Sequence, residues 1–227
     1  MGGVKSKRLL HYEREPRRET AYFYYPGFSE PVLDGAFCYR KAGSIWFLPQ
    51  TRIEGNYRNN HKDGVWNYLK RQEGIDRKKT RLTVTYRNGI HEGDYKVSIH
   101  KRQITSWLNT RLSNDRPIGR MEASIAGRRI QGNCDEEGRA DGLWTLTEPE
   151  GDQRAKRYQE QWSHGKLVES YYVRLKEGRG KHPCEPMILD FISNFIRAEC
   201  VDLERRFSKG CHSWKGSILC DKGSINS

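Results

Sequence analysis

The feature that most constrains this chain is a degenerate internal duplication. Gly55-Asn56, followed by Asp63-Gly64-Val65-Trp66, returns as Gly132-Asn133, followed by Asp141-Gly142-Leu143-Trp144. By subtraction of 55 from 132 and of 63 from 141, the two copies are offset by 77 or 78 residues. Such self-similarity is typical of repeat architectures, in which each unit buries its apolar face only by stacking on its neighbours. The duplication therefore predicts a repeat protein.

The repeated segments predict β-hairpins. Residues 39–46, 57–66 and 86–95 each begin with an aromatic residue, contain a Gly or Asn-Gly turn and carry another aromatic afterwards. Asn88-Gly89 and His164-Gly165 have the composition of tight turns with positive φ angles. A single hairpin is marginally stable in water, so the hairpins must stack. We expect a mainly β fold, an elongated antiparallel sheet of stacked hairpins.

Composition divides the chain into five segments. Residues 1–31 are predicted to be a basic and aromatic N-terminal arm, 32–99 a first hairpin block, 100–119 an inserted helix or loop, and 120–175 a second block. Residues 176–227 contain a glycine-rich hinge, an amphipathic helix and a loose tail.

Two segments have apolar residues at helical spacing. The first predicts a short inserted helix from Ile104, Trp107, Leu108 and Leu112. The second lies between Pro186 and Gly210, and its apolar stripe consists of Ile188, Phe191, Ile192, Phe195, Ile196, Leu203 and Phe207. We expect this C-terminal amphipathic helix to cap the end or face of the last hairpins, as repeat proteins require of their termini. Docking onto a partner or a membrane surface is the alternative.

The hairpins resemble MORN repeats, and more closely the divergent MORN-variant repeats of bacterial proteins described as antitoxin components. The resemblance covers about residues 35–172 and is carried by Gly55 with Tyr57, residues 63–66, residues 86–89 with Gly93 and Tyr95, and residues 141–144. It implies a twisted antiparallel sheet that binds proteins, or sometimes lipid, without chemistry of its own. The antitoxin description would add a toxin as the partner. Cys134 departs from the pattern, since it replaces the aromatic that opens the unit.

Charge and strand alternation indicate a candidate binding surface. The chain has 41 Lys and Arg against 29 Asp and Glu, a formal net charge of +12, which attracts polyanions or an acidic partner. Each of Arg40, Arg58 and Arg87 follows a tyrosine, so the alternation of a strand sends tyrosine and arginine to opposite faces. Stacked in register, these arginines would form a ladder for phosphates or carboxylates. A solvated row of arginines without a ligand is the alternative.

No catalytic, cofactor or metal site is predicted. Cys184, Cys200 and Cys211, with His182 and His212, lack the paired spacing of structural zinc sites. The chain has neither a Gly-x-Ser-x-Gly elbow nor a phosphate-binding Gly-Lys-Ser/Thr loop. The aspartates of the duplicated motif are interpreted as turn residues rather than acid-base groups.

The sequence thus favours a non-enzymatic protein–protein interaction or scaffold module, and an antitoxin is one form that such a module could take. The alternative is an electrostatic binder of nucleic acid or anionic membrane, which would lose binding steeply as salt rises. Without a signal-like or membrane-spanning apolar run, we expect a cytoplasmic protein. Residues 1–6 match an N-myristoylation pattern, so membrane association through acylated Gly2 is a minor alternative. The oligomeric state is not predicted.

Overall fold

The computed structural model describes residues 9–25, 32–42, 49–74, 77–149, 155–175 and 180–199. These residues form one sheet and one helix. The strands are β1 (Leu9–Glu15), β2 (Arg18–Tyr25), β3 (Val32–Lys41), β4 (Gln50–Arg58), β5 (His61–Gln72), β6 (Lys78–Arg87), β7 (Ile90–Lys101), β8 (Ile104–Ser113), β9 (Arg116–Ile125), β10 (Arg128–Cys134), β11 (Ala140–Thr147), β12 (Lys156–Ser163), β13 (Lys166–Arg174) and β14 (His182–Pro183), and the helix is α1 (Ile188–Glu199).

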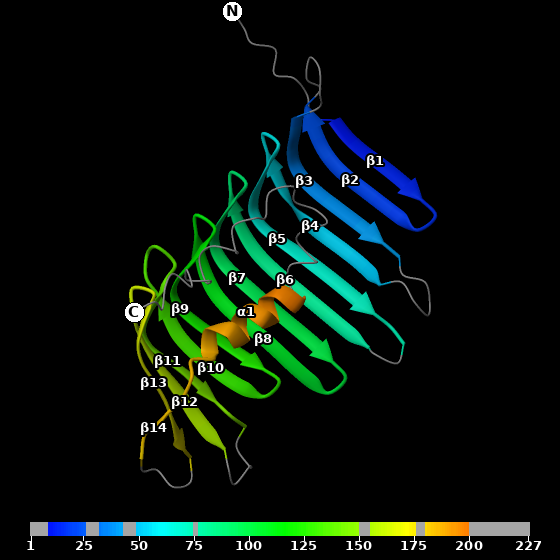
Figure 1. Cartoon of the computed structure of the whole chain (residues 1–227). Coiled ribbons are helices and arrows are strands. Elements are labelled where there is room, and N and C mark those ends of the chain that lie inside the picture. Colours follow the sequence, from blue (N-terminus) through cyan, green and yellow to red (C-terminus); the bar gives the residue numbers. More distant parts are fainter. Residues whose placement is uncertain are drawn as a thin grey trace, which may run out of the picture.

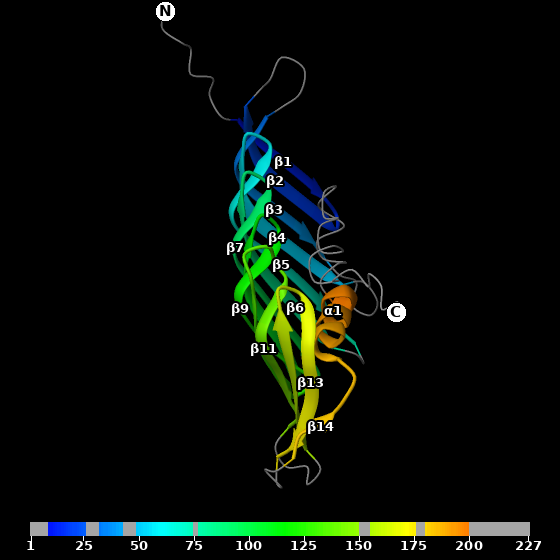
Figure 2. The same cartoon turned by 60° about the vertical axis from the view of Figure 1, so that its left-hand side comes forward.

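The strands pair in the order in which they occur in the sequence. One sheet runs from β1 to β14, and each pairing is antiparallel (Figure 1). The predicted mainly β fold of stacked hairpins is confirmed. The two copies of the duplicated motif belong to one continuous sheet, which is twisted and elongated (Figure 2).

A single hairpin, rather than the longer duplication, is the structural unit. In five hairpins, one residue of the earlier strand lies opposite three residues of the later strand, which is a bulge of two extra residues. Each bulge contains a glycine with positive φ, a conformation that costs glycine little. These glycines are Gly35, Gly64, Gly93, Gly119 and Gly142. By subtraction they lie 29, 29, 26 and 23 residues apart, so the 78 residues from Gly64 to Gly142 span three hairpins.

The predicted turns are confirmed. Asn88-Gly89 and His164-Gly165 both have the two positive φ angles of a tight hairpin turn. The aspartates of the duplicated motif lie in strands rather than in turns, which corrects their sequence-based assignment. Asp63 accepts a hydrogen bond from the backbone N–H of Asn88 at 3.5 Å, and Asp141 accepts one from that of His164 at 3.1 Å. Each carboxylate therefore holds the turn of the following hairpin.

One face of the sheet carries the apolar core, and we call it the inner face. On β6, the side chains of Leu82, Val84 and Tyr86 are buried, whereas the intervening Thr83 and Thr85 belong to the opposite, outer face. The buried cluster extends from Ile53 on β4 to Leu146 on β11, and it includes three residues of α1. The aromatic residues therefore serve chiefly to fill the inner face.

The two tryptophans of the duplication occupy equivalent positions in the core. Trp66 donates its indole N–H to the carbonyl of Asn56 at 3.1 Å, and Trp144 donates to that of Asn133 at 3.0 Å. Each indole lies directly on a glycine of the preceding strand, Gly55 or Gly132, where an added Cβ would overlap the ring. The Gly-Asn…Trp spacing is thus a packing motif.

The two copies cover their tryptophans differently. In the first copy, Tyr57 packs edge-on against Trp66 with ring centroids 5.0 Å apart. The second copy has Cys134 at that position, and Trp144 and Cys134 line a small gap together with Leu189 and Ile192 of α1. The small cysteine leaves room for the helix, which takes the place of the missing aromatic.

The C-terminal helix covers the inner face as predicted. Ile188, Ile192 and Ile196 are buried, and Phe191 and Phe195 pack beside them. The remainder of the predicted stripe, Leu203 and Phe207, lies outside the described residues, as does Gly210.

Two segment assignments from the sequence are wrong. Residues 104–113 form strand β8 rather than an inserted helix, because Leu108, Thr110 and Leu112 point to the inner face at period two and the polar Thr110 conceals that alternation. The N-terminal arm is also too long as predicted, since residues 9–25 form the first hairpin of the sheet. Six of the seven residues of β1 are exposed, because this strand forms the edge of the sheet.

Candidate interaction surface on the outer face

The three predicted ladder arginines do not lie in one row. Arg58 and Arg87 are adjacent to the turns of the β4–β5 and β6–β7 hairpins, at the same end of the strands. Arg40 lies towards the opposite strand ends, where it is paired with Arg52. All three follow a tyrosine that packs in or against the core, so their assignment to the other face holds. Whether they bind a partner remains a prediction.

The strand register produces a different row of arginines on the outer face. Directly opposed residues of neighbouring strands lie on the same face, about 4.8 Å apart per strand. One such row crosses β1 to β13, and we call it the arginine row. Its members in order are Arg14, Glu19, Arg40, Arg52, Leu69, Arg81, Ser98, Trp107, Ser124, Arg129, Thr147, Arg157 and Val173.

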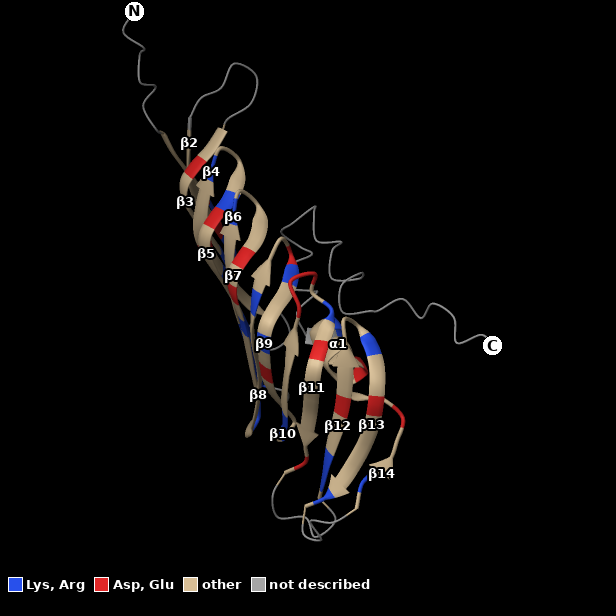
Figure 3. Ribbon diagram, turned by 90° about the vertical axis from the view of Figure 1, so that its left-hand side faces the viewer, with Lys and Arg blue, Asp and Glu red and all other residues tan. Residues whose placement is uncertain are grey.

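Carboxylates neutralise the arginines at the N-terminal end of the row, whereas arginines nearer its C-terminal end have no carboxylate partner in the part of the chain that the structure describes. Arg40 forms an ion pair with Glu19 at 3.7 Å, and Arg52 hydrogen bonds to Glu54 at 2.7 Å through Nε. Among the residues that the structure describes, Arg81, Arg129 and Arg157 are exposed and have no carboxylate within ion-pairing distance. Basic and acidic residues are scattered over the sheet without forming a continuous patch of one sign (Figure 3). These three guanidinium groups are therefore available to an external anion.

Two of the unpaired arginines border a hollow. Arg129 and Arg157 flank Thr147 on neighbouring strands, and the depression around them has a volume of about 380 Å³. Gln131, Thr145 and Glu148 also line this hollow, and the Glu148 carboxylate accepts the backbone N–H of Lys156 at 2.9 Å. The two guanidinium groups suit a carboxylate-bearing segment, while Glu148 reduces the net positive charge of the hollow.

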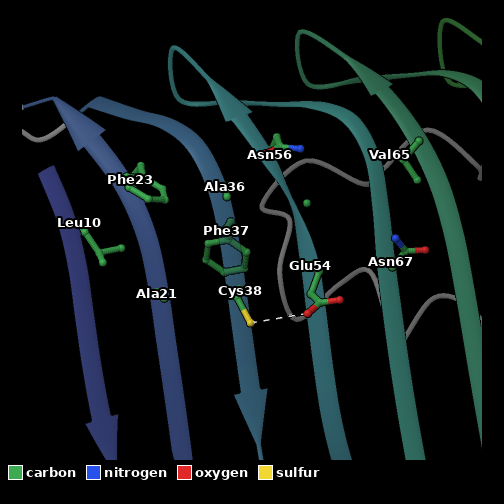
Figure 4. Close-up of a pocket in the computed structure, with 11 residues that line it drawn as sticks. Leu10, Ala21, Phe23, Ala36, Phe37, Cys38, Glu54, Asn56, Val65 and Asn67 are labelled. Carbon is green, nitrogen blue, oxygen red and sulfur yellow. Dashed lines mark hydrogen bonds between the residues drawn. The ribbon is translucent and has the colours of Figure 1, made fainter. Parts of the chain in front are cut away.

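A second hollow of about 410 Å³ lies on the outer face of β1 to β5, and we call it the N-terminal hollow (Figure 4). It is lined chiefly by small and apolar side chains: Leu10, Ala21, Phe23, Ala36, Cys38 and Val65. Burial is the largest influence on the thiol of Cys38 and raises its pKa, to which the Glu54 carboxylate adds, while Arg40 acts in the opposite direction. This hollow offers apolar contact beside the paired end of the arginine row.

The inner face contains one buried histidine in contact with two other titratable side chains. His91 is buried, with Nε2 at 3.0 Å from the hydroxyl of Tyr86 and Nδ1 at 2.5 Å from Asp115. The backbone N–H of His91 also donates to Asp115, at 2.9 Å, so the three side chains join adjacent hairpins. The chain of contacts from Tyr86 through His91 to Asp115 resembles a proton relay. None of these three residues lines either of the two hollows described above.

The cysteine and histidine residues considered for zinc are not gathered in the part of the chain that the structure covers. His182 stacks on Tyr172, and Cys184 lies 3.4 Å from the hydroxyl of Ser170. Cys200, Cys211 and His212 fall outside the described residues, as does Gly2 of the acylation pattern. Within the described ranges, no three His, Cys, Asp or Glu side chains are grouped so as to hold a metal ion.

Comparison with known proteins identifies no family. No protein-family model matches the chain, and no curated protein matches it significantly. Among the described residues, no helix has the length and apolar character needed to cross a bilayer. The arginine row could not be found from sequence, because its members come from different strands, whose register is set by the turns, connections and bulges together.

Proposed function

We propose that the protein is a non-enzymatic interaction module whose outer face binds an acidic segment of another protein. The observation that carries this proposal is the arginine row, with Arg81, Arg129 and Arg157 exposed and without a carboxylate partner in the described structure. The sheet fixes the backbone positions of these arginines, so that binding has to order only their side chains.

The distribution of aromatic residues favours a protein over single-stranded nucleic acid as the partner. Base stacking requires exposed aromatic rings beside the basic groups. Trp66 and Trp144 are almost completely buried on the inner face. Trp107 is the one aromatic member of the arginine row, so the row offers a single ring where successive bases would need several. The arginine row also alternates with neutral side chains, and its N-terminal end is neutralised by Glu19 and Glu54. A mixed surface of this kind suits a shaped protein partner better than a continuous polyanion.

The hairpin unit of 23 to 29 residues supports a MORN-like assignment, which we propose as the structural class. In this interpretation the sheet is a scaffold, and a toxin is one form that the protein partner would take. The cytoplasmic location expected from the sequence is part of the same proposal.

A pull-down from the native host with full-length protein tests the proposal. The bait would be compared with a variant carrying Arg81→Glu, Arg129→Glu and Arg157→Glu. The matched control carries Arg111→Glu, Arg116→Glu and Lys166→Glu, which change the net charge equally but lie towards the other end of the strands.

We expect one acidic protein to be retained by the wild type and the control and lost from the row variant. Equal binding by all three baits would exclude the arginine row as the binding surface. Recovery of nuclease-sensitive material, or of anionic vesicles that dissociate at high salt, would instead favour the electrostatic alternative.

A further inference from the structure

The two edges of the sheet differ in how they end. At the C-terminal edge, β14 contains only His182 and Pro183, and a short strand with proline is a poor template for further pairing. At the N-terminal edge, β1 has seven residues and pairs on one side with β2. No other strand of the described structure pairs with its outer side. One edge is thus protected and the other is open.

The open strand also carries apolar side chains. Leu9, Leu10 and Tyr12 are 42%, 59% and 52% exposed. Leu10 contributes to the N-terminal hollow next to Phe23, which is itself 37% exposed. An open edge with adjacent exposed apolar residues is the arrangement that allows another strand to add to a sheet.

We propose that β1 pairs antiparallel with β1 of a second copy of this chain, about a twofold axis at Tyr12. This proposal is independent of the proposed function. A twofold interface must be complementary to itself, and this register meets that condition. It places Tyr12 against Tyr12, Leu10 against Arg14, His11 against Glu13 and Leu9 against Glu15 of the second copy.

Charge selects this register over its neighbours. Centring the pairing on Glu13 would oppose two glutamates directly, which is destabilising. Centring it on His11 would leave Arg14 and Glu15 unpaired. The Tyr12-centred register pairs all seven residues, sets Glu13 beside His11 and contains no like-charge pair. Because the axis is perpendicular to the sheet, the outer faces of both copies would lie on the same side.

A cysteine introduced at the axis tests the register. Opposed residues of an antiparallel pair have Cα atoms about 4.5 to 5.5 Å apart, which is within the range of a disulfide. Full-length Tyr12→Cys should therefore form a covalent dimer under mild oxidation. The matched control is Val168→Cys, a position on β13 that is 65% exposed. Wild-type protein oxidised in parallel shows how much covalent dimer the native cysteines form by themselves.

A charge pair tests the same contact without a cross-link. Leu10→Lys places a lysine opposite Arg14 of the second copy at two symmetry-related positions, and we expect roughly tenfold weaker dimerisation. Leu10→Glu places a carboxylate there and should preserve the dimer. Sedimentation velocity measures the effect, with Val168→Lys as the control for added charge.

Near-UV circular dichroism of the buried tryptophans establishes that each variant is folded. A wild-type chain that stays at its monomer mass of 26.6 kDa at every concentration would overturn the proposal. So would a dimer that forms equally well with Leu10→Lys, or Tyr12→Cys cross-linking no better than Val168→Cys.

Discussion

Glu160 and Ile188 are 28 residues apart in the sequence, yet the carboxylate of Glu160 accepts the backbone N–H of Ile188 at 2.8 Å. The same oxygen accepts the N–H of Met187 at 2.6 Å, and the other oxygen accepts the indole N–H of Trp162 at 3.1 Å. Glu160 is only 1% exposed. A strand residue therefore supplies hydrogen-bond acceptors that the first turn of α1 lacks, and its negative charge interacts favourably with the helix dipole.

Replacing Glu160 should weaken the docking of α1. In Glu160→Gln, one carboxylate oxygen becomes an NH₂ group that faces N–H donors, so we expect a loss of about 1.5–3 kcal/mol. Urea unfolding measures the loss, and limited proteolysis reports release of the helix. Glu169→Gln on the exposed strand β13 is the control. Equal stability of the two variants would show that the contact contributes nothing.

The contact between Gly132 and Trp144 should be equally sensitive. Gly132→Ala adds a methyl group that overlaps the indole ring, and overpacking of a core costs about 1–3 kcal/mol. Gly55→Ala should behave alike, because Trp66 occupies the equivalent position. Gln131→Ala, an exposed neighbour on β10, controls for the change in strand propensity. Thermal unfolding followed by tryptophan fluorescence would contradict the packing argument if Gly132→Ala matched Gln131→Ala.

The lowered pKa of Asp135, which lies between β10 and β11, predicts that the stability of the fold depends on pH. Desolvation acts to raise the pKa of Asp135, but hydrogen bonds from the backbone and guanidinium of Arg139 and from His164 outweigh it and lower the pKa below its ordinary value of 3.8. A depressed carboxylate pKa stabilises the fold above the ordinary pKa, and this stability disappears as pH falls through the folded-state pKa.

The Asp135→Asn variant checks this dependence. We expect it to be less stable than wild type at pH 7 and the gap to close below about pH 3.8. Denaturant midpoints across pH 2 to 7 (roughly the carboxylate range) measure the gap. Glu136→Gln, exposed in the same loop, is the control. A gap that stays constant with pH would exclude titration of Asp135 as its cause.

The thiol of Cys38 should react slowly with alkylating agents. Burial is the main cause of its raised pKa, and Glu54, whose Oε1 lies 3.9 Å from Sγ, raises it further. Since the thiolate is the nucleophile, a higher pKa leaves less reactive species near neutral pH. Glu54→Gln removes one raising influence, so iodoacetamide labelling of Cys38, followed by mass spectrometry, should become faster. Glu122→Gln, further along the sheet, should leave the rate unchanged.

The sequence predicted the local features and missed those set by strand register. Asn88-Gly89 and Gly55 with Trp66 are short patterns whose physical requirements are visible in the chain itself. Residues 104–113 were misassigned because Leu108 and Leu112 satisfy both a helical and a strand period when Thr110 is discounted. Short patterns of this kind do not reveal which residues of distant strands lie in the same row across the sheet.

The same limit explains the incomplete prediction of the candidate surface. The sequence indicated that Arg40 faces away from the core, which holds, and grouped it with Arg58 on the assumption that the hairpins stack in register. The pairing of β3 with β4 instead places Arg40 opposite Arg52, and the row continues through Leu69 to Arg81. The role of Cys134 was hidden because it depends on α1, which follows it by more than fifty residues.

The order of strands in the sheet has a consequence for synthesis. Each strand pairs with the one made just before it, so a hairpin leaving the ribosome finds its template already in place. Such growth closes only short loops, which favours rapid folding. The exception is α1, made after β14 but packed back against β9 to β11. Until the helix is made, Trp144 lacks the cover that Tyr57 gives Trp66, so this part of the apolar face stays exposed to water in the nascent chain.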